Sequence, residues 1–481
     1  MSDLKKAVMT NWRWVMCAML FFATTVNYMD RQVLSLTFKE FIQPEFHWTD
    51  SDYGTITGVF SIAYAIFCLF AGKFIDWMGT KKGYLIAIIV WSLGAVMHAG
   101  CGWVTEQIVG VADKAALLEA TGAIVSTISM VSVWLFLVCR LILGLGEAGN
   151  FPAAIKVTAE YFPKKDRAFA TALFNAGASV GALAAPATIP LLAKSLGWEW
   201  AFIIIGALGF IWAGIWIFVY DKPTESKHVN EAELEYINSD EAQSDNAQST
   251  KEEKQMSFIE AFKHKQTWSF AFGKFMTDGV WWFFLFWAPA YFQDQFGIKA
   301  SDPQGIALIF TLYAIVTVVS LFGGYLPKIF VEKKGMEPYA GRMRAMLIFA
   351  FFPIFALFAQ PLGGVYGPWA VAIIIGIVGA AHQSWSANIF STTGDMFPKS
   401  AVATITGIGA MAGGVGSFLI NKGSGMLFDH AANLGEAFQF MGFSGKPAGY
   451  MIIFCICAVA YLIGWSVMKS LVPKYEPVVV K

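Results

Sequence analysis

Four charged residues lie in segments of the chain that are otherwise apolar. Asp30 and Arg31 follow the uncharged run WVMCAMLFFATTV, and Arg140 and Glu147 lie seven residues apart in another apolar segment. An ionisable group inside a bilayer costs at least about 2.5–3.5 kcal/mol on insertion scales, so such groups usually serve a function. These four residues are therefore the first candidates for chemistry. Three further ionisable residues occupy similar segments: Lys274, Asp278 and His382.

The two arginines suit a carboxylate ligand. Arg140 and Glu147 lie two turns apart on one helix, about 10 Å along its axis, so they do not pair directly. Asp30 and Arg31 are about 100° apart around their helix and face different directions. A guanidinium with no acid beside it on its own helix can bind a carboxylate from elsewhere bidentately. The sequence predicts that Arg31 and Arg140 bind a carboxylate, with Tyr28 as a nearby hydroxyl. The alternative is that Asp30 forms a structural ion pair with Arg140.

Other polar residues in apolar segments are candidates for contacts with the hydroxyls of a sugar. They are Tyr64, Asn175, Gln383, Ser384 and Asn388. The alternative is that these side chains join helices to one another, as small polar residues do in membranes. Trp281 and Trp282 face either a ligand or lipid. Lys274 and Asp278 are four residues apart on one helix face, so we expect them to pair with each other.

The composition indicates an integral membrane protein. The chain has 481 residues, of which 56% are hydrophobic and 14% are charged, and its mean hydropathy is +0.55. Soluble proteins carry roughly a quarter charged residues. The net charge of zero gives no indication of a nucleic-acid partner. There is no nucleophile motif, no nucleotide-binding loop and no metal spacing among the cysteines. The sequence therefore predicts neither an enzyme nor a cofactor or metal site.

Twelve segments are long and apolar enough to span a membrane as helices. They lie at about 14–37, 52–72, 83–104, 127–150, 166–193, 199–220, 267–292, 304–327, 343–360, 367–395, 401–421 and 449–470. Lys and Arg concentrate in alternate loops, which places both termini in the cytoplasm. The expected fold is an all-α integral membrane protein with twelve transmembrane helices.

The chain divides into two similar halves. Residues 221–263 are polar and charged, so we interpret 1–220 and 264–481 as six-helix halves and 221–263 as a cytoplasmic linker that includes a short amphipathic helix. Residues 144–181 align with 379–416 at a constant offset of 235, and both segments contain a Phe-Pro-Lys turn. Two halves related by a parallel repeat are typical of transporters.

The sequence resembles the major facilitator superfamily. The segment AGKFIDWMGTKKG matches the signature of that family with Gly72, Asp76, Gly79 and Lys81. The segments NYMDR, RLILGLGEAGNFPAAIKVTAEYFP and AHQSWSANIFSTTGDMFPKSAVATITGIGAMAGG resemble the anion:cation symporter branch, and bacterial hexuronate transporters most of all. The resemblance covers nearly the whole chain, although the stretch 104–123 is longer than the family leads us to expect.

The resemblance implies a role for each motif. Arg31 and Arg140 match the family's carboxylate-binding arginines, and Asp30 and Glu147 match its proton-coupling acids. We expect proton-coupled import of a hexuronate, such as glucuronate or galacturonate, by alternating access. Asp76 and Lys81 are expected to hold the two halves together on the cytoplasmic side. The expected partners are an organic anion, protons and lipid, and the expected setting is a monomer in a bacterial inner membrane.

The sequence leaves other functions open. An aldonate, a dicarboxylate or an aromatic acid would use the same carboxylate clamp, and sodium can replace protons at an acid in a cavity. A membrane sensor that binds a sugar acid without moving it would need an output domain, and the only polar segment has about 40 residues.

Overall fold

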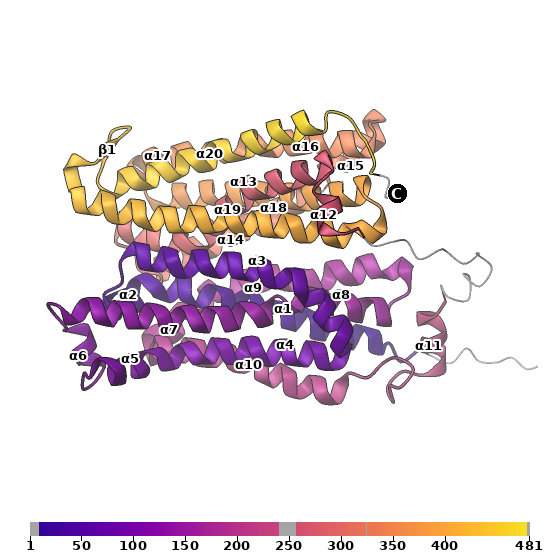
Figure 1. Cartoon of the computed structure of the whole chain (residues 1–481), viewed down its shortest axis with the longest axis horizontal. Helices are drawn as coiled ribbons and strands as arrows, with labels where there is room; N and C mark the ends of the chain where they lie inside the picture. The colour runs from indigo at the N-terminus through magenta and orange to yellow at the C-terminus, as the bar shows by residue number, and fades with distance from the viewer. Residues whose placement is uncertain (1–8, 240–255, 324, 479–481) are drawn as a thin grey trace, which may run out of the picture.

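The fold is almost entirely helical. The computed structural model describes residues 9–239, 256–323 and 325–478. In these ranges the only strands have two residues each, β1 (Gln439–Phe440) and β2 (Phe443–Ser444), and they pair antiparallel. The helices form two bundles that lie side by side, one from each half of the chain (Figure 1). The predicted all-α class with two halves is therefore confirmed.

The N-terminal half runs from α1 to α10. Its long helices are α1 (Trp12–Thr37), α3 (Asp50–Met78), α4 (Thr80–Met97), α7 (Ile124–Glu147), α9 (Lys164–Leu196) and α10 (Trp198–Val219). Its shorter helical pieces are the π-helix η1 (Phe38–Ile42), α2 (Gln43–Phe46), the 3-10 turn η2 (His98–Gly100), α5 (Cys101–Val109), α6 (Lys114–Leu118) and α8 (Asn150–Tyr161).

The C-terminal half runs from α13 to α20. Its long helices are α13 (Lys265–Phe296), α14 (Pro303–Gly323), α16 (Pro338–Phe351), α18 (Pro368–Met396), α19 (Lys399–Leu434) and α20 (Lys446–Leu471). Its shorter pieces are α15 (Leu326–Lys334), the 3-10 segments η3 (Phe352–Phe358) and η4 (Gly435–Ala437), and α17 (Ala359–Tyr366). Two short helices lie between the halves in sequence: α11 (Glu231–Ile237) and α12 (Phe258–Ala261).

The long helices correspond to the twelve predicted spans. In the described part of the chain, ten helical segments are long and apolar enough to cross a membrane. The other two are α1 and α13, with 26 and 32 residues, and they contain more polar and charged residues than most spans. Both exceed the roughly 20 residues that a span requires. These two helices carry Asp30, Arg31, Lys274 and Asp278.

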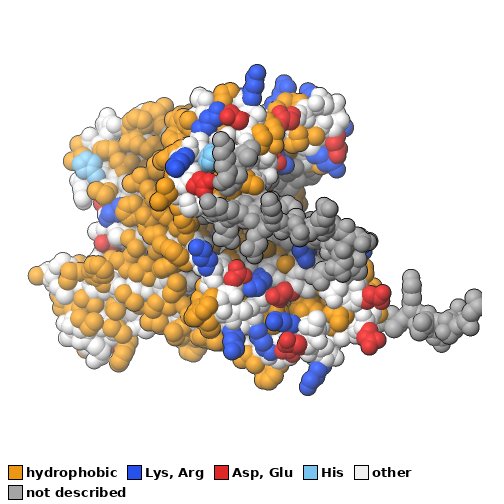
Figure 2. Space-filling view, turned by 45° about the vertical axis from the view of Figure 1, so that its right-hand side comes forward, with side chains coloured by type: hydrophobic (Ala, Val, Ile, Leu, Met, Phe, Trp, Pro, Cys, Tyr) orange, Lys and Arg blue, Asp and Glu red, His pale blue; other side chains and the backbone are white. Residues whose placement is uncertain are grey.

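The outer surface matches a lipid environment along its sides. Phe218, Leu321 and Val365 expose 80%, 74% and 74% of their surface. Hydrophobic side chains cover the flank in Figure 2, whereas Lys, Arg, Asp and Glu gather at one end. Soluble monomers rarely expose such large apolar areas. We call the charged end, where α11, the start of α1 and the end of α20 lie (Figure 1), the termini end, and the other the opposite end.

The repeated Phe-Pro turns have the same conformation in both halves. Phe162 and Phe397 are both extended, at φ/ψ of −126°/134° and −115°/147°, and Pro163 and Pro398 precede α9 and α19 with ψ of 154° in each case. Proline suits the start of a helix because its missing N–H would have no partner there. The repeat inferred from sequence is therefore also a structural repeat.

The two halves meet where small residues let helices approach closely. A Cβ atom at Gly54 of α3 would lie 2.5 Å from the carbonyl oxygen of Asn421, and one at Gly414 of α19 would lie 2.4 Å from the Cβ of Ala65. Glycine at such positions is typical of packing between membrane helices. α3 and α19 therefore form the main seam between the halves.

Part of the predicted linker packs against the N-terminal half. Glu233 of α11 accepts hydrogen bonds from the backbone N–H groups of Trp12 (2.9 Å) and Arg13 (3.1 Å), and pairs with the Arg13 guanidinium at 3.0 Å. It thus caps the start of α1, whose own N-cap Asn11 makes no such bond. Burial raises the pKa of Glu233, but hydrogen bonds from Thr10, Arg13 and Trp12 lower it by more, so the net shift is downward. Residues 240–255 of the linker lie outside the described residues.

The long stretch 104–123 forms α5 and α6 at the opposite end. Lys114 pairs with Glu45 at 3.0 Å and with Glu199 at 2.5 Å, and Leu117 is fully buried. The stretch therefore covers the ends of α2 and α10.

Candidate functional site

The four charged candidates of the N-terminal half come together in its interior. Asp30 and Arg31 lie on α1, and Arg140 and Glu147 lie on α7. Their exposed fractions are 2%, 5%, 2% and 0%. Four ionisable groups without access to water must neutralise one another's charges or bind a ligand that neutralises them.

Arg31 is paired across helices in this structure. Its Nη2 and Nε atoms lie 2.8 and 3.0 Å from Oε2 of Glu147. Neighbouring rings face the guanidinium, with centroids at 4.7 Å for Tyr64, 5.2 Å for Tyr28 and 5.3 Å for Trp282. Such positions favour a cation. As expected, Arg31 has no acid partner on its own helix. In this structure its guanidinium is instead paired with Glu147 of α7.

Arg140 has no hydrogen-bond partner for any of its guanidinium nitrogens within the described residues. Its guanidinium lies 5.5 Å from the centroid of the Phe60 ring. In the same described set, both oxygens of Asp30 and Oε1 of Glu147 also lack partners. No ion pair joins Asp30 or Glu147 to Arg140 in the described ranges. Leaving a buried charged group unsatisfied costs more than about 1–3 kcal/mol. The arrangement can therefore accept an anion with several acceptor atoms.

Two residues near these charges, Asn27 and Trp91, were not singled out by sequence reasoning, and Trp282 was left open between ligand and lipid. Asn27 is buried, and neither amide atom has a partner among the described residues. The Trp91 indole lies near Asp30 but outside hydrogen-bonding geometry. Trp282 reaches Arg31 from the C-terminal half, whereas Trp281 stacks on His382 with centroids 5.4 Å apart. No signal in the sequence distinguishes these two adjacent tryptophans.

The polar candidates of α18 bind mainly to their own half. Ser384 Oγ donates to the Ala380 carbonyl at 2.9 Å, and Asn388 Nδ2 donates to the Ser384 carbonyl at 2.8 Å. His382 Nδ1 lies 2.6 Å from the Tyr461 hydroxyl. Gln383 is half-buried. Ser384 also lies against Gly323 of α14, where a Cβ atom would clash with its side chain.

The remaining candidates are divided between the surroundings of Arg31 and other parts of the molecule. Tyr28 and Tyr64 are half-buried beside Arg31, and Asn175 is exposed on α9. Lys274 and Asp278 form the ion pair expected from their spacing, at 2.7 Å, with Lys274 also over the Phe390 ring. In the described residues, no group of three or more His, Cys, Asp or Glu side chains has a metal-binding arrangement.

In this structure the signature loop between α3 and α4 pairs with the N-terminal half and with the first residue of the linker, and its expected role in joining the two halves stays a prediction. Asp76 pairs with Lys156 of α8 at 2.7 Å, and Lys81 pairs with Asp221, just after α10, at 2.8 Å. Gly79 has φ of +78°, a backbone conformation that suits glycine, and a Cβ at Gly72 would meet no atom within 4 Å.

Comparisons with known proteins agree with this architecture. The sequence model of a family described as Major Facilitator Superfamily matches residues 20–420. A hexuronate transporter of Escherichia coli (strain K12) is 27% identical over 465 residues, which cover 95% of this chain and 94% of the relative. A galacturonate transporter of Dickeya chrysanthemi is 28% identical over 318 residues, which cover 66% and 82% of the two chains.

Solved structures share the fold. A bacterial homolog of the human lysosomal transporter Spinster, in an inward-facing and unoccupied conformation, aligns with a TM-score of 0.67 at 17% identity over 96% of this chain and 98% of that one. A D-xylose-proton symporter aligns with a TM-score of 0.66 at 15% identity over 97% and 98% of the two chains.

Proposed function

Since this multi-pass membrane protein belongs to the Major Facilitator Superfamily and is a transporter rather than an enzyme, we propose that it is a symporter. Its substrate is a sugar acid of the hexuronate class, such as glucuronate or galacturonate, and it moves together with protons. The observation that carries the proposal is the buried guanidinium of Arg140, which has no partner among the described residues and lies among two acids and a second arginine. The names of the relatives support the substrate class.

The balance of buried charge supports proton coupling. When Asp30, Arg31, Arg140 and Glu147 are all ionised, their charges sum to zero. A bound carboxylate adds one negative charge, and one proton on Asp30 or Glu147 restores the sum. Because uncompensated buried charge is costly, binding of the carboxylate and of the proton favour each other. We infer that at least one proton accompanies each substrate carboxylate.

Arg31 supplies the second half of the carboxylate clamp by exchanging partners. The substrate meets Arg140 first, because its five N–H groups are without partners in the described structure. It then replaces Glu147 at Arg31, and the released Glu147 takes up a proton. Asp30, which has no partner at its oxygens in the described ranges, is the second acid available to protons.

The proposed contacts with the rest of the substrate come from both halves. They are Tyr28, Tyr64, Asn175, Gln383, Ser384, Asn388 and Trp282. Alternating access then moves the two halves around the site, with Lys274 and Asp278 and the loop of Gly72, Asp76, Gly79 and Lys81 as structural elements. The termini end faces the cytoplasm of a bacterial inner membrane, since the Lys and Arg residues of the loops concentrate there. The protein is proposed to act as a monomer.

Trp282→Ala is expected to weaken glucuronate binding about tenfold, because it removes the ring that reaches Arg31 from the other half. The matched control is Trp281→Ala, which removes an adjacent tryptophan that stacks on His382 within the C-terminal half. Binding of radiolabelled glucuronate to the purified protein measures both variants. Equal losses in the two variants would argue against a substrate contact at Trp282.

The proposed function is tested by uptake into proteoliposomes. Radiolabelled glucuronate and galacturonate are expected to accumulate when an inward proton gradient is imposed, and to equilibrate without one. One coupled proton allows about tenfold accumulation per pH unit. A parallel series with a sodium gradient distinguishes the coupling ion.

The same assay separates the alternatives. Absence of uptake for both sugar acids under every gradient would contradict the hexuronate assignment, and a panel of aldonates, dicarboxylates and aromatic acids would then be tested. Accumulation driven by a sodium gradient would show that sodium, and not the proton, is the coupling ion. Binding without any uptake or exchange would favour a sensor.

A further inference from the structure

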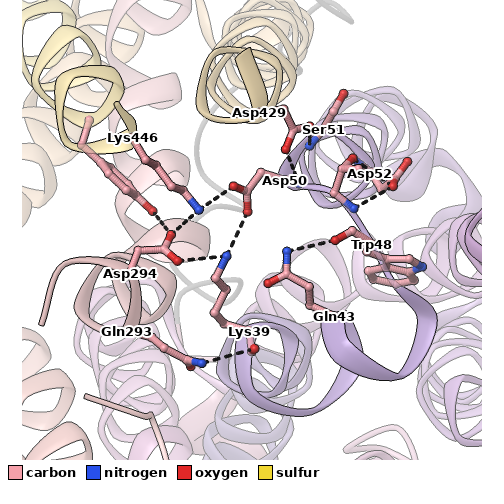
Figure 3. Close-up of polar contacts among 12 residues, drawn as sticks. Lys39, Gln43, Trp48, Asp50, Ser51, Asp52, Gln293, Asp294, Asp429 and Lys446 are labelled. Carbon is pink, nitrogen blue, oxygen red and sulfur yellow. Dashed lines mark hydrogen bonds and ion pairs between the residues drawn. The ribbon is translucent and has the colours of Figure 1, made fainter. Parts of the chain in front are cut away.

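Four charged residues form a closed ring between the halves at the opposite end (Figure 3). Lys39 of η1 and Asp50 at the start of α3 come from the N-terminal half. Asp294 of α13 and Lys446 at the start of α20 come from the C-terminal half. None of the four was a candidate for substrate binding or proton coupling.

Each cation of the ring contacts both anions. Lys39 Nζ lies 3.2 Å from Asp50 Oδ1 and 3.0 Å from Asp294 Oδ1. Lys446 Nζ lies 2.5 Å from Asp50 Oδ2 and 2.5 Å from Asp294 Oδ2. The side chains expose only 6–16% of their surface. Every contact therefore joins opposite charges out of bulk water, where such contacts are strongest.

Further polar contacts cross between the halves beside the ring. Asp429 of α19 accepts hydrogen bonds from the backbone N–H groups of Asp50 (2.9 Å) and Ser51 (2.7 Å), at the N-terminus of α3. Lys422 of α19 donates to Ser51 Oγ at 3.0 Å and to Thr55 Oγ1 at 2.5 Å. An acid at a helix N-terminus is stabilised by the free N–H groups there. The C-terminal half therefore caps a helix of the N-terminal half.

The termini end is different. Its ion pairs in the described ranges, such as Lys156–Asp76, Lys81–Asp221 and Arg342–Asp395, lie within one half or join it to its adjoining linker segment. Within the same ranges, every ion pair that joins the two halves lies at the opposite end. In the described ranges, ion pairs thus join the halves at one end only.

We propose that the ring is a latch that closes the opposite end in one state of the transport cycle and opens by exchange of partners. When the halves separate there, Lys39 keeps Asp50 and Lys446 keeps Asp294, so no charge of the ring is left without a partner. Of the four contacts in the ring, opening breaks two, Lys39–Asp294 and Lys446–Asp50, together with the neighbouring contacts of Asp429 and Lys422 that cross between the halves. The two crossing contacts of the ring therefore stabilise only the closed state. Opening does not leave a charge of the ring buried without a partner, which would be costly.

The inference rests on the proposed function only in requiring that the two halves move relative to each other. It predicts the effect of exchanging charges within one half. Lys39→Asp with Asp50→Lys preserves the pair inside the N-terminal half but places Asp opposite Asp294 and Lys opposite Lys446. Asp294→Lys with Lys446→Asp does the same from the other half. All four substitutions together restore opposite charges at every contact, and all three variants keep the net charge of the chain.

The test measures the separation of the halves at the opposite end without substrate. Spin labels are placed at Glu119, directly after α6, and at Gln439 of β1, in a background without the six native cysteines. Both residues are exposed, and α6 and β1 lie at the opposite end (Figure 1). Electron–electron resonance distances are expected to be short in the unswapped protein. Either two-residue swap should raise the ratio of open to closed molecules about tenfold or more, and the four-residue swap should return it to the starting value.

Two results would overturn the latch. Distances that stay short in both two-residue swaps would show that the contacts do not hold the end closed. A four-residue swap that stays open would show that complementarity across the halves is not what matters. Because no substrate is used, either result is independent of whether glucuronate is transported.

Milder variants keep the test decisive where a swapped chain does not fold. Asp50→Asn and Asp294→Asn each remove a crossing ion pair without reversing a charge, so both should lengthen the distance. The matched control is Asp302→Asn, since the Lys194–Asp302 pair also crosses between the halves but is 3.9 Å long, with its side chains 55% and 40% exposed. Exposed pairs contribute little. Unchanged distances in both Asp50→Asn and Asp294→Asn would overturn the proposal.

Discussion

Arg140→Lys is expected to abolish high-affinity binding of the sugar acid. The guanidinium of Arg140 is buried, and none of its nitrogens has a hydrogen-bond partner in the described structure. It offers a carboxylate two parallel N–H groups in a fixed plane, whereas lysine offers a single hydrated point charge. Lysine keeps the charge but loses the second N–H of the bidentate pair, and a hydrogen bond to a charged group contributes about 1.5–3 kcal/mol, or roughly 10- to 150-fold in Kd.

The measurement is equilibrium binding of radiolabelled glucuronate to purified protein. The matched control is Arg342→Lys, which changes a partly buried arginine of the C-terminal half that is already bidentate to Asp395, at 2.7 and 3.3 Å. That control should keep the original Kd. Retention of affinity in Arg140→Lys would mean that Arg140 does not bind the carboxylate.

Glu147→Gln is expected to uncouple transport from the proton gradient. Glutamine keeps the shape of a protonated glutamate but cannot release a proton, and it no longer competes as an anion for Arg31. Substrate binding and exchange of internal for external substrate should therefore survive. Accumulation under an inward proton gradient should fall from about tenfold per pH unit to equilibrium.

Counterflow and gradient-driven uptake in the same proteoliposomes check this result. Asp30→Asn is measured alongside and should also lose accumulation if both acids carry protons. Asp395→Asn is the control, since it neutralises an acid paired with an arginine outside the site. Full accumulation by Glu147→Gln would remove Glu147 from the proton pathway, and loss of counterflow would assign it to substrate binding instead.

The sequence by itself determined the class of fold. Each span is a local property, because about 20 consecutive apolar residues are enough for a helix to cross a bilayer. The Phe-Pro turns at Phe162 and Phe397 were also readable, since proline imposes the same backbone in both halves. The ion pair of Lys274 and Asp278 followed from helical spacing alone.

Only the tertiary structure decided which charges meet across helices. Helical periodicity says which residues share a face, but it does not say which helix lies against that face. The pairing of Arg31 with Glu147 and the unpaired state of Arg140 in the described structure therefore could not be read from two separate segments. The same limit applies to Asp76 and Lys81, because their partners in this structure, Lys156 and Asp221, lie 80 and 140 residues away.

The tertiary structure also distinguishes two neighbouring residues, Trp281 and Trp282, for which the sequence gives the same signal. Trp281 and Trp282 differ by about 100° around α13, and only the packing of the other half decides that Trp282 reaches Arg31. The ring of Lys39, Asp50, Asp294 and Lys446 is the clearest case. Its members lie near helix ends, where a charge is ordinary for a membrane protein. Only the folded halves bring each lysine nitrogen within 3.2 Å of an oxygen of both aspartates.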